Sequence, residues 1–219
     1  MRRAGYTWIA GVDEAGRGAL AGPVVAAAVV LGPDDPQIPG VDDSKRLDSA
    51  TRTRLAHHVR RAHRHAVVAV AADAIDRSNI RLATRRAMRR ALGRLPQAPD
   101  AVLVDAVRLG DDLGAPVLPL IKGDALSYAI AAASVLAKVA RDAMMTTLDR
   151  RHPHYGFADH KGYGAARHRE ALRRYGPTAE HRLSFRTVVP RRDDDRRRAR
   201  APMRARAHAA ASPPLPRVR

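Results

Sequence analysis

The sequence predicts one α/β domain, residues 1–190, built on a mixed β-sheet flanked by helices and followed by an Arg-rich tail, residues 191–219. Apolar residues make up 45% of the 219-residue chain, which is enough to fill one core. Short runs rich in Val and Ala alternate with longer segments of helical periodicity. Neither pattern continues beyond Pro190, where a low-complexity segment predicts disorder.

Five apolar runs predict the strands of the sheet. They are Trp8–Val12, Pro23–Leu31, Ala66–Ala72, Ala101–Val104 and Val117–Ile121. Helices are predicted at about 49–63, 79–92, 124–148 and 165–174, with Asp124 as the N-cap of the long third helix. Gly32–Gly40 and His152–Gly164 are rich in turn-forming or polar residues and predict loops. Strands and helices in this order favour a single mixed sheet.

The charge of the chain indicates a polyanionic partner. The formal net charge is +18; residues 191–219 carry ten Arg and three Asp, so seven of these charges lie in the tail and eleven in residues 1–190. A bias toward Arg is the alternative, because only four of the 40 basic residues are Lys. We expect the tail to act as a solvated electrostatic tether that contacts nucleic acid non-specifically.

Composition excludes several other classes of protein. The chain has no Cys, and therefore no disulfides, thiolate zinc sites or cysteine nucleophiles. No run of 18 apolar residues predicts a membrane span. Acidic Asp13 and Glu14 interrupt the first apolar stretch too early for a signal peptide, so we expect a cytoplasmic protein, and a monomer.

Four carboxylates stand at the ends of predicted elements. Asp13 and Glu14 close the first strand, Asp105 closes the fourth, and Asp124 opens the long helix. Sites in α/β sheets form at the carboxyl ends of strands, where these side chains could converge. Because neighbouring strand residues point to opposite faces, Asp13 and Glu14 share a site only if the pleat breaks near Gly16. Clustered carboxylates with no Cys favour Mg²⁺ or Mn²⁺.

Three other interpretations remain open at this point. Gly16–Ala21 fits G-x-G-x-x-A, a dinucleotide-binding pattern, but an apolar strand-like run follows where that pattern needs a helix. A zinc site could draw on His152, His154, His160 or His168. The basic surface could belong to a non-catalytic nucleic-acid-binding protein, in which each carboxylate is a surface acid or a helix cap.

A series of short motifs runs in a consistent order from Ile9 to Phe185. It comprises GVDEAGRG (11–18), LAGPVV (20–25), Asp43-Ser44-Lys45, Ile75-Asp76, Asn79-Ile80, Val104-Asp105, Lys122-Gly123-Asp124, Ile130–Ser134, Ala137–Val139, Arg141-Asp142, HKGYG (160–164), His181-Arg182 and Ser184-Phe185. In this combination the chain resembles ribonuclease HII, the bacterial type 2 ribonuclease H family. The resemblance implies an RNase H-like fold.

The resemblance also implies an endonuclease that cuts RNA–DNA hybrids, or DNA duplexes containing ribonucleotides, on the 5′ side of a ribonucleotide. The products would carry 3′-hydroxyl and 5′-phosphate ends. By the resemblance, the catalytic carboxylates that bind metal are Asp13, Glu14, Asp105 and Asp124, and the turn that senses the ribonucleotide is formed by Gly16, Arg17 and Gly18. Tyr163 would pack against the sugar, and Lys45 and Lys161 would contact phosphates. Two metal ions are expected with substrate bound, and Asp142 is expected to support the site structurally.

Three positions depart from the family pattern. Ala106 stands where glycine usually follows the aspartate, Ala165 where threonine usually follows Lys-Gly-Tyr-Gly, and His152 in place of a commoner tyrosine. These changes affect the local backbone and one hydroxyl, and none of them alters an implied metal ligand.

Overall fold

A computed structural model describes residues 1–41, 47–110 and 112–188. The strands in this part of the chain are β1 (Ile9–Ala15), β2 (Val24–Leu31), β3 (Arg64–Val70), β4 (Ala101–Asp105) and β5 (Val117–Leu120). The α-helices are α1 (Ser49–Ala62), α2 (Ala72–Asp76), α3 (Ile80–Leu92), α4 (Gly123–Leu126), α5 (Tyr128–Arg151), α6 (Phe157–His160) and α7 (Ala166–Tyr175), and a 3₁₀ helix η1 spans Arg2–Ala4. Lys45 and the 191–219 tail lie outside the described residues.

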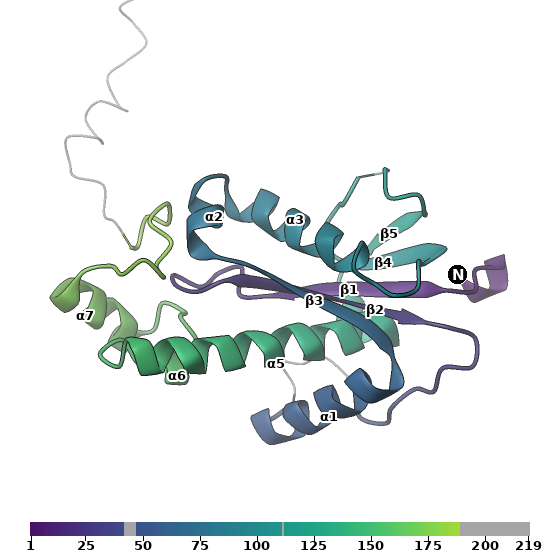
Figure 1. The fold of residues 1–219 in the computed structure, drawn as a ribbon, viewed down its shortest axis with the longest axis horizontal. Helices are drawn as coiled ribbons and strands as arrows, with labels where there is room; N and C mark the ends of the chain where they lie inside the picture. Colours follow the sequence, from purple (N-terminus) through teal and green to yellow (C-terminus); the bar gives the residue numbers. More distant parts are fainter. Residues whose placement is uncertain (42–46, 111, 189–219) are drawn as a thin grey trace, which may run out of the picture.

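The strands form one mixed sheet with the order β3-β2-β1-β4-β5. β1 lies in the centre, antiparallel to β2 and parallel to β4. Helices α2 and α3 cover one face of the sheet, and α5 with α1 covers the other (Figure 1). The predicted α/β architecture with a mixed sheet is therefore confirmed.

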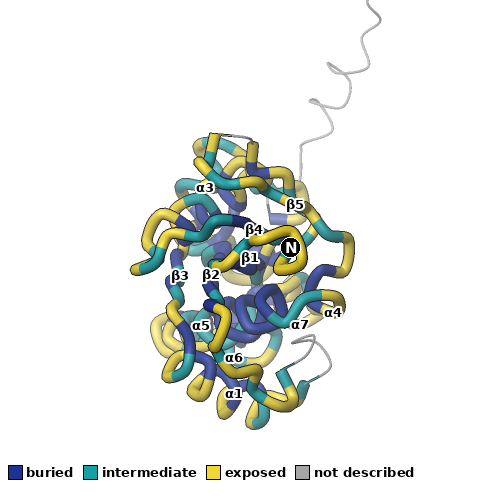
Figure 2. Tube along the Cα trace, turned by 90° about the vertical axis from the view of Figure 1, so that its right-hand side faces the viewer, coloured by how far each residue is buried: buried dark blue, intermediate teal, exposed yellow. Residues whose placement is uncertain are grey.

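Small residues bring the helices close to the sheet. Alternate residues of β2 face the two layers: Val24 and Ala26 pack with α3, whereas Ala27 and Val29 pack with α5 and α1. At Gly11 of β1, a Cβ atom would lie 2.1 Å from the backbone of α5. Figure 2 shows buried residues through the central strands and in α5, where Ala129–Ala137 are all buried. None of the described helices is long and apolar enough to cross a bilayer.

Two expectations about the strand and helix ends are wrong. β1 does not stop before its acids, because Asp13 and Glu14 are still paired with Ala27 and Ala26 of β2. Asp124 does not cap the long helix. It lies inside the short α4, and α5 begins only after Ser127, whose backbone is extended. The carboxylate of Asp105 accepts a hydrogen bond from the Gly123 amide at 2.8 Å, which ties the start of α4 to the end of β4.

The order of the elements also excludes the dinucleotide-binding interpretation. Strand β2, and not a helix, follows the glycines of residues 16–22. The segment predicted as one loop, His152–Gly164, contains the short helix α6. Helix α2, at the start of the crossover from β3 to α3, has no signal in the periodicity because it is only five residues long.

We predict that Ala165→Thr raises stability. Ala165 is the N-cap of α7, with extended backbone (φ −64°, ψ 160°) and no side-chain capping hydrogen bond. A threonine hydroxyl there can accept from an amide of the first turn, which stabilises helices by about 1 kcal/mol. Chemical denaturation should show this gain. An unchanged midpoint for Ala165→Thr, beside an equally unchanged Ala165→Val control, would mean that the cap is not formed.

Candidate active site

The register of the sheet brings two of the predicted acids side by side. β1 and β4 are parallel, and their last paired residues are Val12 and Val104. Asp13 and Asp105 are each the next residue along. On the β4 side, the pairing of β1 ends here, while on the β2 side it continues to Ala15. The end of β1 therefore has one open edge, beside Asp105.

A cavity of about 490 Å³ lies at this open edge. It is lined by Asp13, Glu14, Ala15, Gly16, Arg17, Gly18, Arg52, Asp105, Ser134, Lys138 and Tyr163. Asp13 and Glu14 both border it although the pleat does not break between them. Because every residue from Asp13 to Gly18 contributes, the cavity follows the chain around the strand end and is reached from both faces of β1.

The surroundings of Asp13 disfavour its negative charge. Its side chain is only 5% exposed and faces α5. Burial raises the pKa of Asp13 well above its usual range, and the charges of Glu14 and Asp105 raise it further. Hydrogen bonds from the Glu14 amide, at 2.7 Å, and from the Ser134 hydroxyl act in the opposite direction. This is the mutual destabilisation expected of carboxylates that share one site.

Asp124 reaches this region through α4. The Asp105 carboxylate binds the Gly123 amide, so the next residue, Asp124, lies close to the end of β4. Asp124 is buried, 6% exposed, and its carboxylate accepts from the Ala125 amide at 3.1 Å. It is not among the residues that line the 490 Å³ cavity.

The chemistry of these four carboxylates fits a hard divalent cation. Their donors are oxygens only, and a cation would relieve the repulsion that raises the Asp13 pKa. Within residues 1–41, 47–110 and 112–188, however, no three acidic or His side chains form a ready-made coordination site. Glu14 is instead drawn to Arg17, at 3.2 Å. Binding a metal here requires these side chains to turn toward one another.

Two buried arginines hold the glycine turn beside the acids. Arg182, fully buried, donates to the carbonyls of Gly16 (2.7 Å), Arg17 (2.8 Å) and Gly22 (2.9 Å). Arg141, also fully buried, donates from Nε to the carbonyl of Pro23 at 3.0 Å. The turn is therefore fixed through its backbone, which leaves its remaining groups at the cavity.

Gly16 has to be glycine in this arrangement. Its φ is +93°, and a Cβ atom would lie 1.9 Å from Nε of Arg141. The predicted sugar-contacting residue lies next to this turn. Tyr163 is 41% exposed, its ring lies over the guanidinium of Arg141 at 5.3 Å, and a Cβ atom on Gly18 would lie 4.0 Å from that ring. The turn and Tyr163 thus form one wall.

The loop that carries Tyr163 is attached directly to the glycine turn. The Gly162 carbonyl accepts from the amides of Leu20 (2.8 Å) and Ala21 (3.3 Å). A Cβ atom on Gly162 would lie 2.5 Å from the Ala21 oxygen, so only glycine permits this approach. Lys161, predicted as a phosphate contact, does not line the cavity; its ammonium donates to the Ala158 carbonyl.

The sequence did not single out three polar residues of the cavity. Ser134 and Lys138 come from α5, and Arg52 comes from α1. Asp142, predicted to support the site, pairs with Lys138 at 2.7 Å and with Arg52 at 3.7 Å. Lys138 and Asp142 lie four residues apart, a spacing at which side chains of opposite charge meet on one face of a helix, and this spacing could have indicated their ion pair from the sequence. The structure also places Ala106 in the left-handed region, φ +48°, where glycine is the unstrained residue.

Comparison with known proteins agrees with this geometry. The family model for ribonuclease HII matches residues 10–188. The ribonuclease HII of Geobacillus kaustophilus is 54% identical over 186 residues, covering 84% of this chain and 70% of that protein. That of Syntrophotalea carbinolica is 52% identical over 189 residues, covering 86% and 90%. The chain belongs to the ribonuclease HII family.

Solved structures share the fold of this ribonuclease HII. In the complex of PCNA with RNase HII from Archaeoglobus fulgidus, a chain that is 28% identical superposes with a TM-score of 0.71, covering 85% of this chain and 98% of that one. The RNase H-like fold implied by the motifs is confirmed. The relatives named above are hydrolytic endoribonucleases, and so is this chain.

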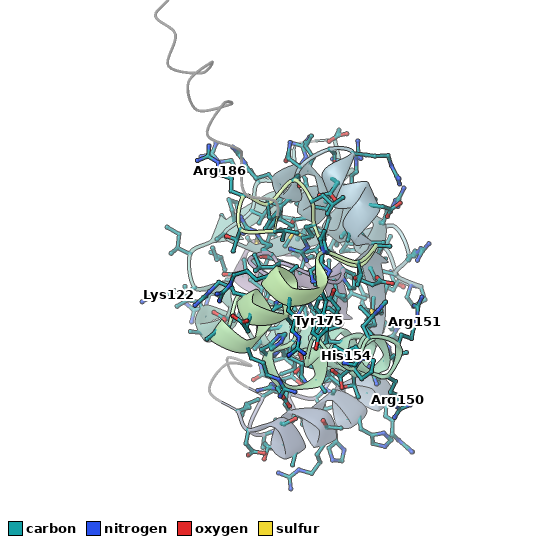
Figure 3. All side chains as sticks on the ribbon, turned by 90° about the vertical axis from the view of Figure 1, so that its left-hand side faces the viewer. Lys122, Arg150, Arg151, His154, Tyr175 and Arg186 are labelled. Atoms are coloured by element: carbon teal, nitrogen blue, oxygen red, sulfur yellow. The ribbon has the colours of Figure 1, made fainter. Side chains whose placement is uncertain are left out.

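The histidines of this ribonuclease HII do not form a zinc site in the described residues. His168 and His181 are buried and hydrogen-bonded to each other, Nε2 to Nε2, at 3.0 Å. His160 stacks on His168 with ring centroids 4.6 Å apart. His154 stacks instead on Tyr175 at the surface, at 5.1 Å (Figure 3). These rings form the base under the Tyr163 loop.

The partners of His168 and His181 fix their tautomers. His168 donates from Nδ1 to the Tyr163 carbonyl at 2.9 Å, so its Nε2 accepts from His181. Nδ1 of His181 in turn accepts from the Thr178 amide at 2.9 Å. Both rings are therefore neutral in this arrangement. Burial, together with the neighbouring His168, lowers the pKa of His181 to about 4.

We predict that acid destabilises the enzyme through this pair. The unfolded state binds a proton to His181 near pH 6.5 and the folded state only near pH 4, so the stability contribution is complete above pH 6.5 and is lost as the pH falls toward 4. The loss should reach about 2–3 kcal/mol. The free energy of unfolding measured in urea at several pH values tests this.

The control is His181→Gln, which keeps a donor near Nε2 but does not titrate. Its free energy of unfolding should be lower than that of the wild type at pH 7 and should change less between pH 6.5 and 4.5. Equal pH slopes for both proteins would show that His181 does not titrate as proposed.

Proposed function

We propose that this ribonuclease HII hydrolyses the phosphodiester 5′ to ribonucleotides, in RNA–DNA hybrids and in DNA duplexes with embedded ribonucleotides. The products carry 3′-hydroxyl and 5′-phosphate ends, and the cellular use is removal of misincorporated ribonucleotides and RNA primers. One observation carries the proposal: the acids Asp13, Glu14 and Asp105 line the same cavity as the backbone-anchored glycine turn and Tyr163.

The acids supply the binding site for divalent cations, Mn²⁺ or Mg²⁺. Asp13, Glu14, Asp105 and Asp124 are the residues that would hold two of them when substrate is bound. Bound there, such cations supply an activated water for in-line attack and charge stabilisation for the leaving 3′-oxygen. The protein's own contribution is to hold the acids at the end of β1 and β4, where burial already favours a neutralising charge at Asp13.

The glycine turn and Tyr163 recognise the sugar. A 2′-hydroxyl both donates and accepts hydrogen bonds, so it is read by backbone N–H and C=O groups at close range. The turn from Gly16 to Gly18 offers such groups without side chains at its two ends. Tyr163 is exposed beside Gly18 and can pack against the ribose. Selectivity then depends on the ribose and not on the base sequence.

Besides Arg17, which pairs with Glu14, the cavity of the acids is lined by two further cations, Lys138 and Arg52. Asp142 holds them in place through its two carboxylate oxygens. We assign them to binding the phosphate that is cleaved or its neighbour. Lys45 stays a predicted phosphate contact, and Lys161, bound to the Ala158 carbonyl, is a contact only if its side chain turns outward.

We predict that Asp105→Asn abolishes cleavage without unfolding the site. Asparagine keeps the oxygen that accepts from the Gly123 amide but removes the charge that a cation needs. The cleavage rate should fall by at least about 100-fold, which corresponds to roughly 3 kcal/mol of transition-state stabilisation. The assay is a labelled DNA duplex with one ribonucleotide, incubated with Mg²⁺ or Mn²⁺.

The matched control is Asp73→Asn, which removes the same charge from the exposed surface of α2. It should cut as the wild type does, once, 5′ to the ribonucleotide. An all-DNA duplex of the same sequence should stay intact. Retained cleavage by Asp105→Asn, with either metal, would place the chemistry elsewhere.

We also predict that the 191–219 tail contributes affinity and not chemistry. Removing its seven net positive charges should weaken binding to duplex DNA at low salt by roughly tenfold or more, an effect that disappears as salt rises. Cleavage at saturating substrate and selectivity for the ribonucleotide should remain. Loss of the single cut in the truncated protein under those conditions would contradict this role.

A further inference from the structure

A second cavity, of about 750 Å³, adjoins the cavity of the acids. Its walls come from the glycine turn, from the start of α3 and from the segment after β4. The lining residues are Arg17, Asn79, Ile80, Arg81, Leu82, Thr84, Arg85, Ala106, Val107 and Arg108. The two cavities share Arg17, and Ala106 directly follows Asp105, so they lie next to each other along the protein surface.

This second cavity is strongly basic. Four of its lining residues are arginines, and none is acidic. Arg81, Arg85 and Arg108 are exposed, and none of them forms a salt bridge with an acid in the described part of the chain, although the charge of Arg85 contributes to lowering the pKa of Asp112. Arg89, in the last turn of α3, is by contrast held by Asp112 at 2.6 Å. Three guanidinium groups are therefore available here for an anion, and their planar donors suit phosphate oxygens.

The backbone and a hydroxyl add to this charge. α3 is a 13-residue helix whose N-terminus forms part of the wall, with Asn79 as its cap accepting from the Leu82 amide at 2.9 Å. Such an end carries partial positive charge. Thr84, 1% exposed, also lines the cavity, and its hydroxyl has no hydrogen-bond partner among the described residues. A buried hydroxyl without a partner is costly unless a ligand satisfies it.

We propose that this second cavity binds backbone phosphates of the strand that is cut, next to the scissile bond. The inference rests on the proposed function, because a strand whose phosphate lies at Asp13 and Asp105 continues past Arg17 into the second cavity. The ligand is the phosphodiester backbone, whatever the bases. The cavity holds the duplex in register, while the glycine turn reads the ribose.

The test compares two pairs of arginines on the same helix. Arg81→Gln/Arg85→Gln removes two charges from the cavity, and Arg86→Gln/Arg90→Gln removes two charges from exposed positions of α3 that do not line it. Binding of the full-length proteins to a fluorescent DNA duplex is measured by anisotropy without divalent metal, between about 50 and 300 mM salt, a range over which two phosphate contacts change the affinity about 25-fold.

The cavity variant should bind more weakly than wild type at low salt, and its slope of log K against log salt should be shallower by about 1.8, two phosphate contacts at 0.9 each. The control pair should bind and cleave as the wild type does. Equal slopes for the two double variants would overturn the proposal, since the effect would then come from net charge alone.

Thr84→Val separates a role in phosphate binding from a structural role of Thr84. Valine has nearly the same shape but lacks the hydroxyl, so the midpoint of thermal unfolding should not fall, while duplex affinity should drop several-fold. A lower unfolding midpoint with unchanged affinity would show that Thr84 serves the fold and would count against the site.

Two further arms separate the sources of phosphate and the two proposals. Inorganic phosphate at matched ionic strength should compete poorly; competition at low millimolar concentration would indicate a free-anion site and overturn the assignment to the strand backbone. Wild-type cleavage of the ribonucleotide duplex is scored independently. If the wild type does not cut but the slopes differ as stated, the proposed reaction fails while the phosphate site stands.

Discussion

The burial of two guanidinium groups under the glycine turn is the constraint on which the site depends. Residues 16–23 leave β1 and return to β2 without sheet partners for several of their carbonyls, and Arg141 and Arg182 supply the missing donors. Burial and the nearby charge of Arg141 lower the pKa of Arg182 to about 10, which measures how unfavourable this arrangement is for a cation. Substituting either arginine would leave buried carbonyls without partners, and the turn would lose its fixed shape.

That constraint explains why the acids and the sugar-reading residues occur together. Arg141 comes from α5, the helix that also supplies Ser134 to Asp13, and its guanidinium lies under the ring of Tyr163. One helix therefore sets the position of the acid at the end of β1 and of the tyrosine across the cavity. A shift of α5 would therefore move both Asp13 and Tyr163, the residues proposed to hold a cation and to contact the sugar.

The strands could be predicted because apolar runs mark β1 to β5, and Asp13, Glu14 and Asp105 became candidates because they stand at the ends of two of these runs. The ends of elements could not. The break between α4 and α5 falls at Ser127, and the start of α4 is tied to Asp105, 18 residues earlier in the chain; no local signal near Asp124 reveals either feature. We expected Asp13 and Glu14 to share a site only if the pleat of the strand broke near Gly16. Both line the cavity although β1 stays paired with β2 as far as Ala15, because the other edge of β1 is open there.

The charge of the chain has a more complex meaning than its sum indicates. A net charge of +18 predicts a polyanionic partner. Arg141 and Arg182 contribute to this sum but are buried inside the protein, where they donate hydrogen bonds to backbone carbonyls. Arginine suits that task because one planar group reaches several carbonyls, as Arg182 does. The charges that nucleic acid can meet are those without an acidic partner, such as Arg81 and Arg85 on α3. Pairing and burial, and not the count of basic residues, therefore decide where on this enzyme a phosphate backbone can bind.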